Sequence, residues 1–170
     1  MIYVLNGIER KPLKQHIDDR GIFSEIYRED WFDFLIAEKI KQFNLSSGYS
    51  KVVRAWHRHK LGQIDYFIVI KGALKIAAFD EESGELSVLV ADSRNLEIVR
   101  IPGKYWHGNM VVSDEPALFV YGISNLYNHN NPDEERIPWN SIRVTPKSIN
   151  GNSEDPRVNR PWDWYSNRNK

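Results

Sequence analysis

The sequence predicts an all-β protein with a sandwich or barrel architecture. Between residues 50 and 124, short segments rich in Val, Ile, Tyr and Phe follow one another. Gly, Pro, Asp, Ser and Asn separate them at intervals of about ten residues, a cadence typical of β-sandwiches and barrels. The length of 170 residues suits one domain with a substantial core. We therefore expect a single domain over residues 1–170, with the core barrel roughly at 22–127 and a C-terminal tail roughly at 128–170.

The expected elements can be placed in order along the chain. A turn at 18–21 leads into an extended segment at 22–27, and Asp30 is suited to cap a short helix at 30–36. Gly72 separates two strands almost without a gap, which predicts a tight turn. The polar, proline-containing tail is expected to wrap the barrel, with Trp139, Trp162 and Trp164 as its anchors. The expected strands are 50–56, 64–71, 73–79, 86–90, 96–101, 107–112 and 117–123.

Composition excludes several classes of function. Lys and Arg total 23, as do Asp and Glu, so the formal net charge is zero. That balance argues against a general nucleic-acid binder, which needs a basic excess. The absence of Cys excludes disulfides, Cys-zinc sites and thiol nucleophiles. No apolar run approaches the ~18 residues of a membrane span, and no signal pattern is seen at the N-terminus. We expect a cytoplasmic protein that does not bind membranes.

Three histidines and a carboxylate are placed where chemistry is expected. His57 and His59 are two residues apart, so on a strand their side chains point to the same side. Gln63 and Asp65 repeat this spacing at the start of the next strand, and a Pro-Gly turn precedes His107. These residues begin or end adjacent strands, which would bring them to one mouth of a small barrel, where ligands bind.

The same residues carry a resemblance to the cupins, and the chain is more specifically similar to the dTDP-4-dehydrorhamnose 3,5-epimerase family. The matching segments occur in the family's order and cover most of the chain; they are 19–25, 42–46, 53–57, 101–108, 119–121 and 137–140. The resemblance implies a double-stranded β-helix (the jelly roll of the cupins), with short peripheral helices and a wrapped C-terminal tail. It also implies an isomerase of deoxysugar and surface-polysaccharide biosynthesis.

Members of this family invert C3 and C5 of a 4-keto-6-deoxy sugar carried on dTDP, without a cofactor. The resemblance makes His57 the base that removes a proton beside the ketone, and Tyr121 the acid that returns it. Asp155 is the first candidate for the carboxylate that orients His57, and Asp163 the second. The implied partner is a dTDP-linked or other nucleotide-linked deoxysugar, bound by a homodimer.

The implied substrate-binding residues come from several segments. Arg54 and His107 would neutralise sugar and phosphate oxygens, and the planar guanidinium of Arg54 suits a diphosphate. Arg54 and His57 have opposite strand parity, so both can face the pocket only if a bulge or strand end intervenes. The remaining candidates are Arg20, Phe23 and Glu25, which in the family often reach a neighbouring subunit, together with Gln42, Asn44, His59 and Asp65.

Two departures from the family pattern keep other functions open. Asp65 stands where the family usually has Lys, and His59 stands where it commonly has Gln or another polar residue. With His57 and His107, these two residues nearly reproduce a cupin site for Fe, Mn, Ni or Zn. The alternatives are therefore a metal-dependent cupin enzyme, a sugar-nucleotide 3,4-ketoisomerase that uses His57 with His59, and a non-catalytic sugar-binding cupin.

Overall fold

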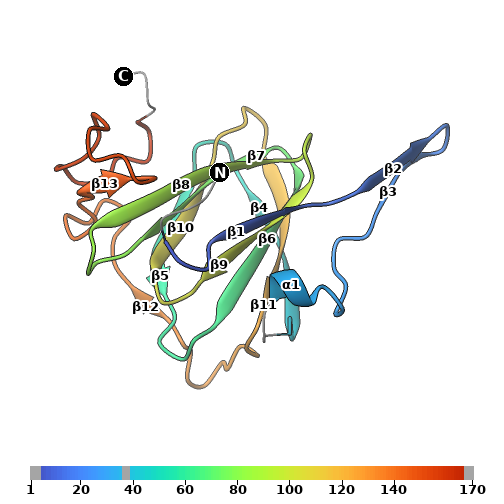
Figure 1. Ribbon diagram of the computed structural model, residues 1–170, viewed down its shortest axis with the longest axis horizontal. Helices are drawn as coiled ribbons and strands as arrows, with labels where there is room; N and C mark the ends of the chain where they lie inside the picture. The colour runs from blue at the N-terminus through green and yellow to red at the C-terminus, as the bar shows by residue number, and fades with distance from the viewer. Residues whose placement is uncertain (1–4, 36–38, 167–170) are drawn as a thin grey trace.

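Two β-sheets form the body of the protein (Figure 1). The computed structural model describes residues 5–35 and 39–166. The five-stranded sheet has the order β1 (Glu9–Pro12), β9 (Glu97–Pro102), β6 (Ile64–Lys71), β11 (Ala117–Ile123), β4 (Gln42–Gly48). The six-stranded sheet has the order β12 (Glu135–Arg136), β5 (Val53–Arg58), β10 (Trp106–Val111), β7 (Ala73–Phe79), β8 (Glu85–Asp92), β13 (Ser148–Ile149). All pairs are antiparallel except β13 with β8.

The main core lies between these sheets. Phe67 and Val69 of β6 and Phe119 of β11 pack in one cluster with Leu74 and Ile76 of β7. These side chains alternate along their strands because successive residues of a strand point to opposite faces. Two antiparallel sheets joined through a shared apolar core confirm the expected jelly roll.

The outer faces of both sheets are also covered in their central parts. On the five-stranded sheet, Phe34 of α1 (Phe32–Leu35) packs edge-on against Tyr66, with ring centroids 5.9 Å apart. On the six-stranded sheet, the C-terminal segment contributes Trp162 and Trp164 to a second apolar cluster. Strands β6 and β7 are therefore buried on both sides, which explains their nearly continuous apolar sequences.

The C-terminal segment is held by specific contacts as well as by apolar packing. Trp164 is fully buried against Trp56, with ring centroids 4.8 Å apart. The ammonium of Lys75 donates hydrogen bonds to the carbonyls of Trp164 and Ser166. Trp162 and Trp164 are thus buried anchors, as expected. Trp139 is 44% exposed, and its carbonyl accepts a hydrogen bond from Trp56.

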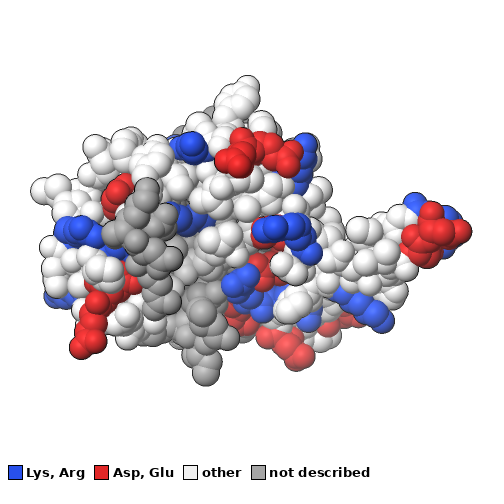
Figure 2. All heavy atoms as spheres, turned by 90° about the horizontal axis from the view of Figure 1, so that it is seen from above, with Lys and Arg blue, Asp and Glu red and all other residues white. Residues whose placement is uncertain are grey.

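A two-stranded hairpin projects from the body as an arm (Figure 1). The arm consists of β2 (Gln15–Asp18) and β3 (Gly21–Ser24). Gly21 closes its turn with φ of +130°, a conformation that favours glycine. The tip is charged, with Arg20 paired to Asp18 (Figure 2). Apolar side chains along the arm are exposed, so the arm does not pack on its own barrel.

The expected and observed elements agree closely in the barrel. Strands β6, β7 and β11 have the expected bounds, and the other expected barrel strands are found within a few residues of them. Helix α1 is shorter than expected, and residue 36 lies outside the described residues. Strands β1, β2, β4, β12 and β13 were not among the expected strands. None of the helices in the described ranges is both long enough and apolar enough to span a membrane.

Candidate active site

A cavity of about 630 Å³ lies between the two sheets. Strands β4, β5, β6, β10 and β11 contribute to its walls, and the segment 127–137, which includes β12, contributes further lining residues. Its polar lining includes most of the residues expected from the sequence: Gln42, Asn44, Arg54, His57, His59, Asp65 and Tyr121. The sheet architecture therefore collects residues that are far apart in the sequence around one space of ligand size.

Arg54 and His57 both reach this cavity because β5 contains a bulge. His57 lies opposite His107 of β10, and Arg54 lies opposite Asn109. Three steps along β5 therefore match only two steps along β10. One extra residue in a strand reverses its alternation, so two side chains of opposite parity line the same wall. Of the two possibilities left open by the sequence, a bulge or a strand end, the structure has the bulge.

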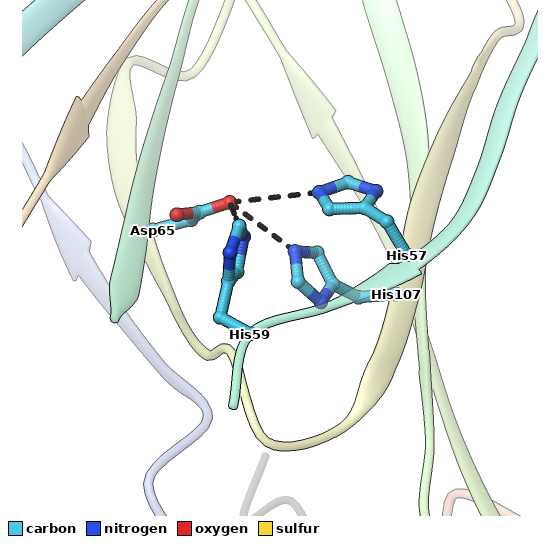
Figure 3. A group of neighbouring side chains, drawn as sticks. All are labelled: His57, His59, Asp65 and His107. Carbon is cyan, nitrogen blue, oxygen red and sulfur yellow. Dashed lines mark hydrogen bonds and ion pairs between the residues drawn. The ribbon is translucent and has the colours of Figure 1, made fainter. Parts of the chain in front are cut away.

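Four side chains meet at the inner wall, as Figure 3 shows. Oδ2 of Asp65 lies 3.2 Å from Nε2 of His107, 3.7 Å from Nε2 of His59 and 4.0 Å from Nε2 of His57. Asp65 comes from β6, His57 from β5 and His107 from β10, while His59 directly follows β5. His107 is fully buried and does not line the cavity, whereas the side chain of His57 is 25% exposed.

The charges of this cluster follow from burial and proximity. Burial lowers the pKa of His57 to about 4, and the neighbouring His107 adds to this effect. Burial alone would raise the pKa of Asp65, but the imidazoles of His107, His57 and His59 outweigh it and hold that pKa well below its usual value. At neutral pH the cluster therefore presents a carboxylate at position 65 and an uncharged imidazole at position 57.

Two of the histidines are oriented by backbone carbonyls. Nδ1 of His107 lies 2.9 Å from the carbonyl oxygen of Tyr105. Nδ1 of His59 lies 2.6 Å from the carbonyl oxygen of Asp133. A carbonyl only accepts hydrogen bonds, so both rings carry a hydrogen on Nδ1. The Nε2 atoms of both rings consequently face Asp65.

Tyr121 lies across the cavity from the histidine wall. It comes from β11 of the five-stranded sheet, and its ring stacks on Phe67 with centroids 5.8 Å apart. Burial raises its pKa above the usual value, and the negative charge of Asp65 raises it further. The phenol therefore keeps its proton at neutral pH. His57 and Tyr121 face one cavity from opposite sheets, one as a proton acceptor and the other as a donor.

Polar side chains on β4 and β5 complete one side of the cavity. The guanidinium of Arg54 donates to the hydroxyl of Ser46 at 2.6 Å and to the carbonyl of Ser47 at 2.8 Å. Gln42 donates to Asn44 at 2.8 Å. The cation is thus held in place by neutral partners, and none of the carboxylates in the described part of the chain forms a salt bridge with it, which leaves its charge available to an anion.

Asp155 lies elsewhere, and the expectation that it orients His57 is corrected. Its buried carboxylate accepts hydrogen bonds from Arg157 at 2.8 and 2.9 Å in the C-terminal segment. Neither Asp155 nor the exposed Asp163 is among the residues that line the cavity. The carboxylate beside His57 is Asp65, because β6 places it directly across from the end of β5.

The arm residues are also outside this chain's cavity. Arg20 is paired with Asp18, and Glu25 with Arg28. Phe23 is 65% exposed and lies 6.1 Å from His16, between ring centroids. A binding role for Arg20, Phe23 and Glu25 therefore requires a second molecule.

Sequence reasoning missed four lining residues in the segment after β11. They are Tyr127, His129, Glu134 and Arg136. The rings of Tyr127 and His129 form an edge-on pair with centroids 4.9 Å apart. The segment is polar and has no strand periodicity, so nothing in the sequence indicates which of its side chains face inward. Its attachment to β5 through β12 is a tertiary feature.

The fold and the site together define the class of protein: it is a cupin whose jelly-roll cavity is suited to proton transfer. The profile of the dTDP-4-dehydrorhamnose 3,5-epimerase family matches residues 4–156. The chain belongs to this family, whose members are isomerases.

Similar proteins agree with this placement. The chain is 38% identical over 140 residues to the probable low-salt glycan biosynthesis epimerase Agl13 of Haloferax volcanii, which covers 79% of this chain and 88% of the relative. It is 31% identical over 156 residues to the spore coat polysaccharide biosynthesis protein SpsL of Bacillus subtilis, covering 89% and 99%.

The fold agrees with that of solved epimerases. The dTDP-6-deoxy-D-glucose-3,5-epimerase of Legionella pneumophila, in complex with dTDP-4-keto-L-rhamnose, superposes with a TM-score of 0.73 at 20% identity, covering 94% of this chain and 84% of the other. A dTDP sugar isomerase of Desulfovibrio desulfuricans gives a TM-score of 0.75 at 23% identity, covering 85% and 92%.

Proposed function

We propose that this protein epimerises a 4-keto-6-deoxy sugar carried on a nucleoside diphosphate, with His57 as the base and Tyr121 as the acid. The observation that carries the proposal is the placement of an uncharged imidazole and a protonated phenol on opposite walls of one cavity. Membership of the epimerase family supports the same reaction.

The reaction needs a base on one face of a carbon and an acid on the other. Carbons beside the C4 ketone carry weakly acidic protons. The imidazole of His57 takes one of these protons, and the electron pair of the broken C–H bond moves into the enolate, whose oxygen becomes negative. Tyr121 then donates its phenolic proton to the opposite face of the same carbon, and the enolate returns to the ketone with inverted configuration. Exchange with water returns a proton to Tyr121 and removes one from His57, so no net oxidation occurs. Each positioned group contributes about 10²–10⁴-fold to such a step.

Arg54 is the candidate for holding the charged part of the substrate. Arg54 lines the cavity and belongs to β5, the strand that also carries His57. The planar guanidinium presents N–H donors in a geometry that matches two phosphate oxygens. Gln42 and Asn44 are candidates for sugar hydroxyls. A dTDP-linked sugar is the substrate we favour, because solved proteins of the same fold are complexed with dTDP-4-keto-L-rhamnose or dTDP-quinovose.

A homodimer would bring the arm residues into use. Arg20 and Phe23 lie on the projecting hairpin, whose apolar side chains are exposed, and Glu25 directly follows it. An aromatic ring and an arginine at such a position suit a nucleotide base and a diphosphate of a partner's substrate. Light scattering gives the mass of the particle in solution.

The test is proton exchange in heavy water. We expect the protein to introduce deuterium at C3 or C5 of dTDP-4-keto-6-deoxyglucose, as followed by NMR, which also distinguishes an epimer from a keto isomer. His57→Asn should reduce the exchange by about 10²–10⁴-fold. Tyr121→Phe should reduce epimer formation by a similar factor. Tyr49→Phe is the matched control, because Tyr49 is 77% exposed and lies outside the cavity. Unchanged exchange in His57→Asn would refute the proposal.

A further inference from the structure

We propose that His59, Asp65 and His107 bind one divalent transition-metal ion, with Zn²⁺ the best-suited ion, at the inner wall beside His57. These three ligands are at least 95% buried. Contacts within the chain support metal binding at this site. Its role in the reaction, given below, rests on the proposed function.

His107 makes two contacts that indicate a cation beside its ring. Nδ1 donates its hydrogen to the Tyr105 carbonyl at 2.9 Å, while Nε2 lies 3.2 Å from the Asp65 carboxylate. In an uncharged ring, the Nε2 lone pair would point at a negative oxygen. The contact is favourable only if a positive charge lies between the two atoms, either a proton or a metal ion.

His59 repeats this arrangement. Its Nδ1 donates to the Asp133 carbonyl at 2.6 Å, and its Nε2 lies 3.7 Å from the same Asp65 oxygen. The amide nitrogen of Gln63 lies 3.1 Å from this Nε2. An amide nitrogen is only a donor, so this contact and a bound ion compete for the single lone pair on Nε2 of His59, and an ion bound there displaces the amide of Gln63. The ligand atoms of His59, Asp65 and His107 lie within 4.8 Å of one another.

The distances suit one ion better than separate protons. Zinc bonds to imidazole nitrogen and carboxylate oxygen are about 2.0–2.2 Å long, so ligand atoms of a tetrahedral site lie about 3.4 Å apart. The observed 3.2 and 3.7 Å fall on either side of that value. A proton joins only two atoms, whereas an ion satisfies all three ligands. In both rings, Nδ1 donates to a backbone carbonyl while Nε2 faces the proposed ion. Hydrogen bonds of this kind fix the orientation of metal-binding histidines.

His57 differs from these ligands. Its Nε2 is the most distant of the three imidazole nitrogens from Asp65, at 4.0 Å, and its side chain is 25% exposed. Two nitrogens and one oxygen leave a fourth position of a tetrahedral ion open, as in catalytic zinc sites. Because His59 and Asp65 line the cavity, that position is adjacent to the substrate. The bound cation would offset the charge of Asp65 and attract the enolate oxygen, as a Lewis acid does.

Metal content is the direct test. The full chain, produced without a histidine tag, is stripped with a chelator, incubated with Zn²⁺ or Co²⁺, and dialysed. We expect about one ion per chain, and visible absorption of four-coordinate Co²⁺ that Zn²⁺ displaces. Asp65→Asn and His107→Asn should weaken binding at least tenfold. Asp114→Asn, at an exposed aspartate, is the matched control. Circular dichroism checks that each variant folds. If a variant does not fold, the metal content of the wild-type chain decides whether the site binds an ion.

The outcomes separate this inference from the proposed function. His57→Asn should retain the ion with affinity within about twofold and lose deuterium exchange; loss of the ion in this variant would overturn the three-ligand site. A wild-type chain that binds no ion but exchanges deuterium would overturn the metal site and leave the epimerase proposal standing. A chain that binds one ion but exchanges no deuterium would support the site and overturn the proposed function.

Discussion

Gly108 is the residue whose replacement tests the geometry of the site most directly. It lies on β10 next to His107, where β10 pairs with the bulged part of β5. A Cβ added at this position would lie 2.7 Å from Cα of Ala55 and 2.7 Å from the carbonyl oxygen of Arg54. These are backbone atoms of the strand that carries His57, so they cannot rotate out of the way.

The size of the effect follows from those distances. Ordinary contacts between carbon atoms are about 3.5–4.0 Å, so Gly108→Ala must separate β10 from β5 by roughly 1 Å. Overpacking of this kind costs about 1–3 kcal/mol, and we expect the upper end because backbone must move. Gly48→Ala is the matched control: its Cβ meets only the end of the Val111 side chain, at 2.8 Å. That change should cost less than about 1 kcal/mol.

Two assays check the prediction. Urea denaturation gives the change in the free energy of unfolding, and deuterium exchange gives the effect on the site. A displacement of about 1 Å at a reacting group can reduce the rate by about 10²-fold. A Gly108→Ala protein with wild-type stability and wild-type exchange would refute the reasoning, because the strands would then tolerate the separation or would not be as close as described.

Two further predictions concern the C-terminal segment and the pH dependence. Trp164→Ala should destabilise the protein by about 3–5 kcal/mol in urea denaturation, because it empties a fully buried site against Trp56. Tyr165→Ala, at an exposed position, should lower the free energy of unfolding far less. Equal losses in the two variants would contradict the packing described for Trp164. The pKa of His57 is lowered to about 4, and protonation inactivates a base, so exchange should fail only as the pH drops toward that value. The rate at pH 5.5 should stay within about twofold of that at pH 7.5, whereas an ordinary imidazole would lose about tenfold.

Most of the barrel could be predicted because its signals are local. Strands β6 and β7 are continuous apolar runs ended by Gly72 and other turn residues, and their bounds agree with expectation. The meeting of His57, His59 and Asp65 was also predictable, because their spacing on neighbouring strands fixes a shared face. Short strands such as β12 and β13 have no such signal, since two residues carry no periodicity and pair only in the folded chain.

The part of the site that sequence missed depends on long-range placement. Asp155 was chosen from the C-terminal tail, whose sequence has no helix or strand periodicity, so spacing gives no information about its neighbours. Its carboxylate forms a salt bridge with Arg157, two residues away. Conversely, Glu134 and Arg136 line the cavity because the segment after β11 returns to the edge of β5. Nothing short of the tertiary fold indicates that return.

The irregularity in β5 has an implication for how such proteins diversify. Arg54 and His57 line the same wall because β5 has one extra residue between them relative to β10. Removing residue 55 would restore regular pleating and turn Arg54 to the opposite face while His57 kept its place. A one-codon deletion would therefore remove one cation from the cavity lining without changing a single remaining side chain.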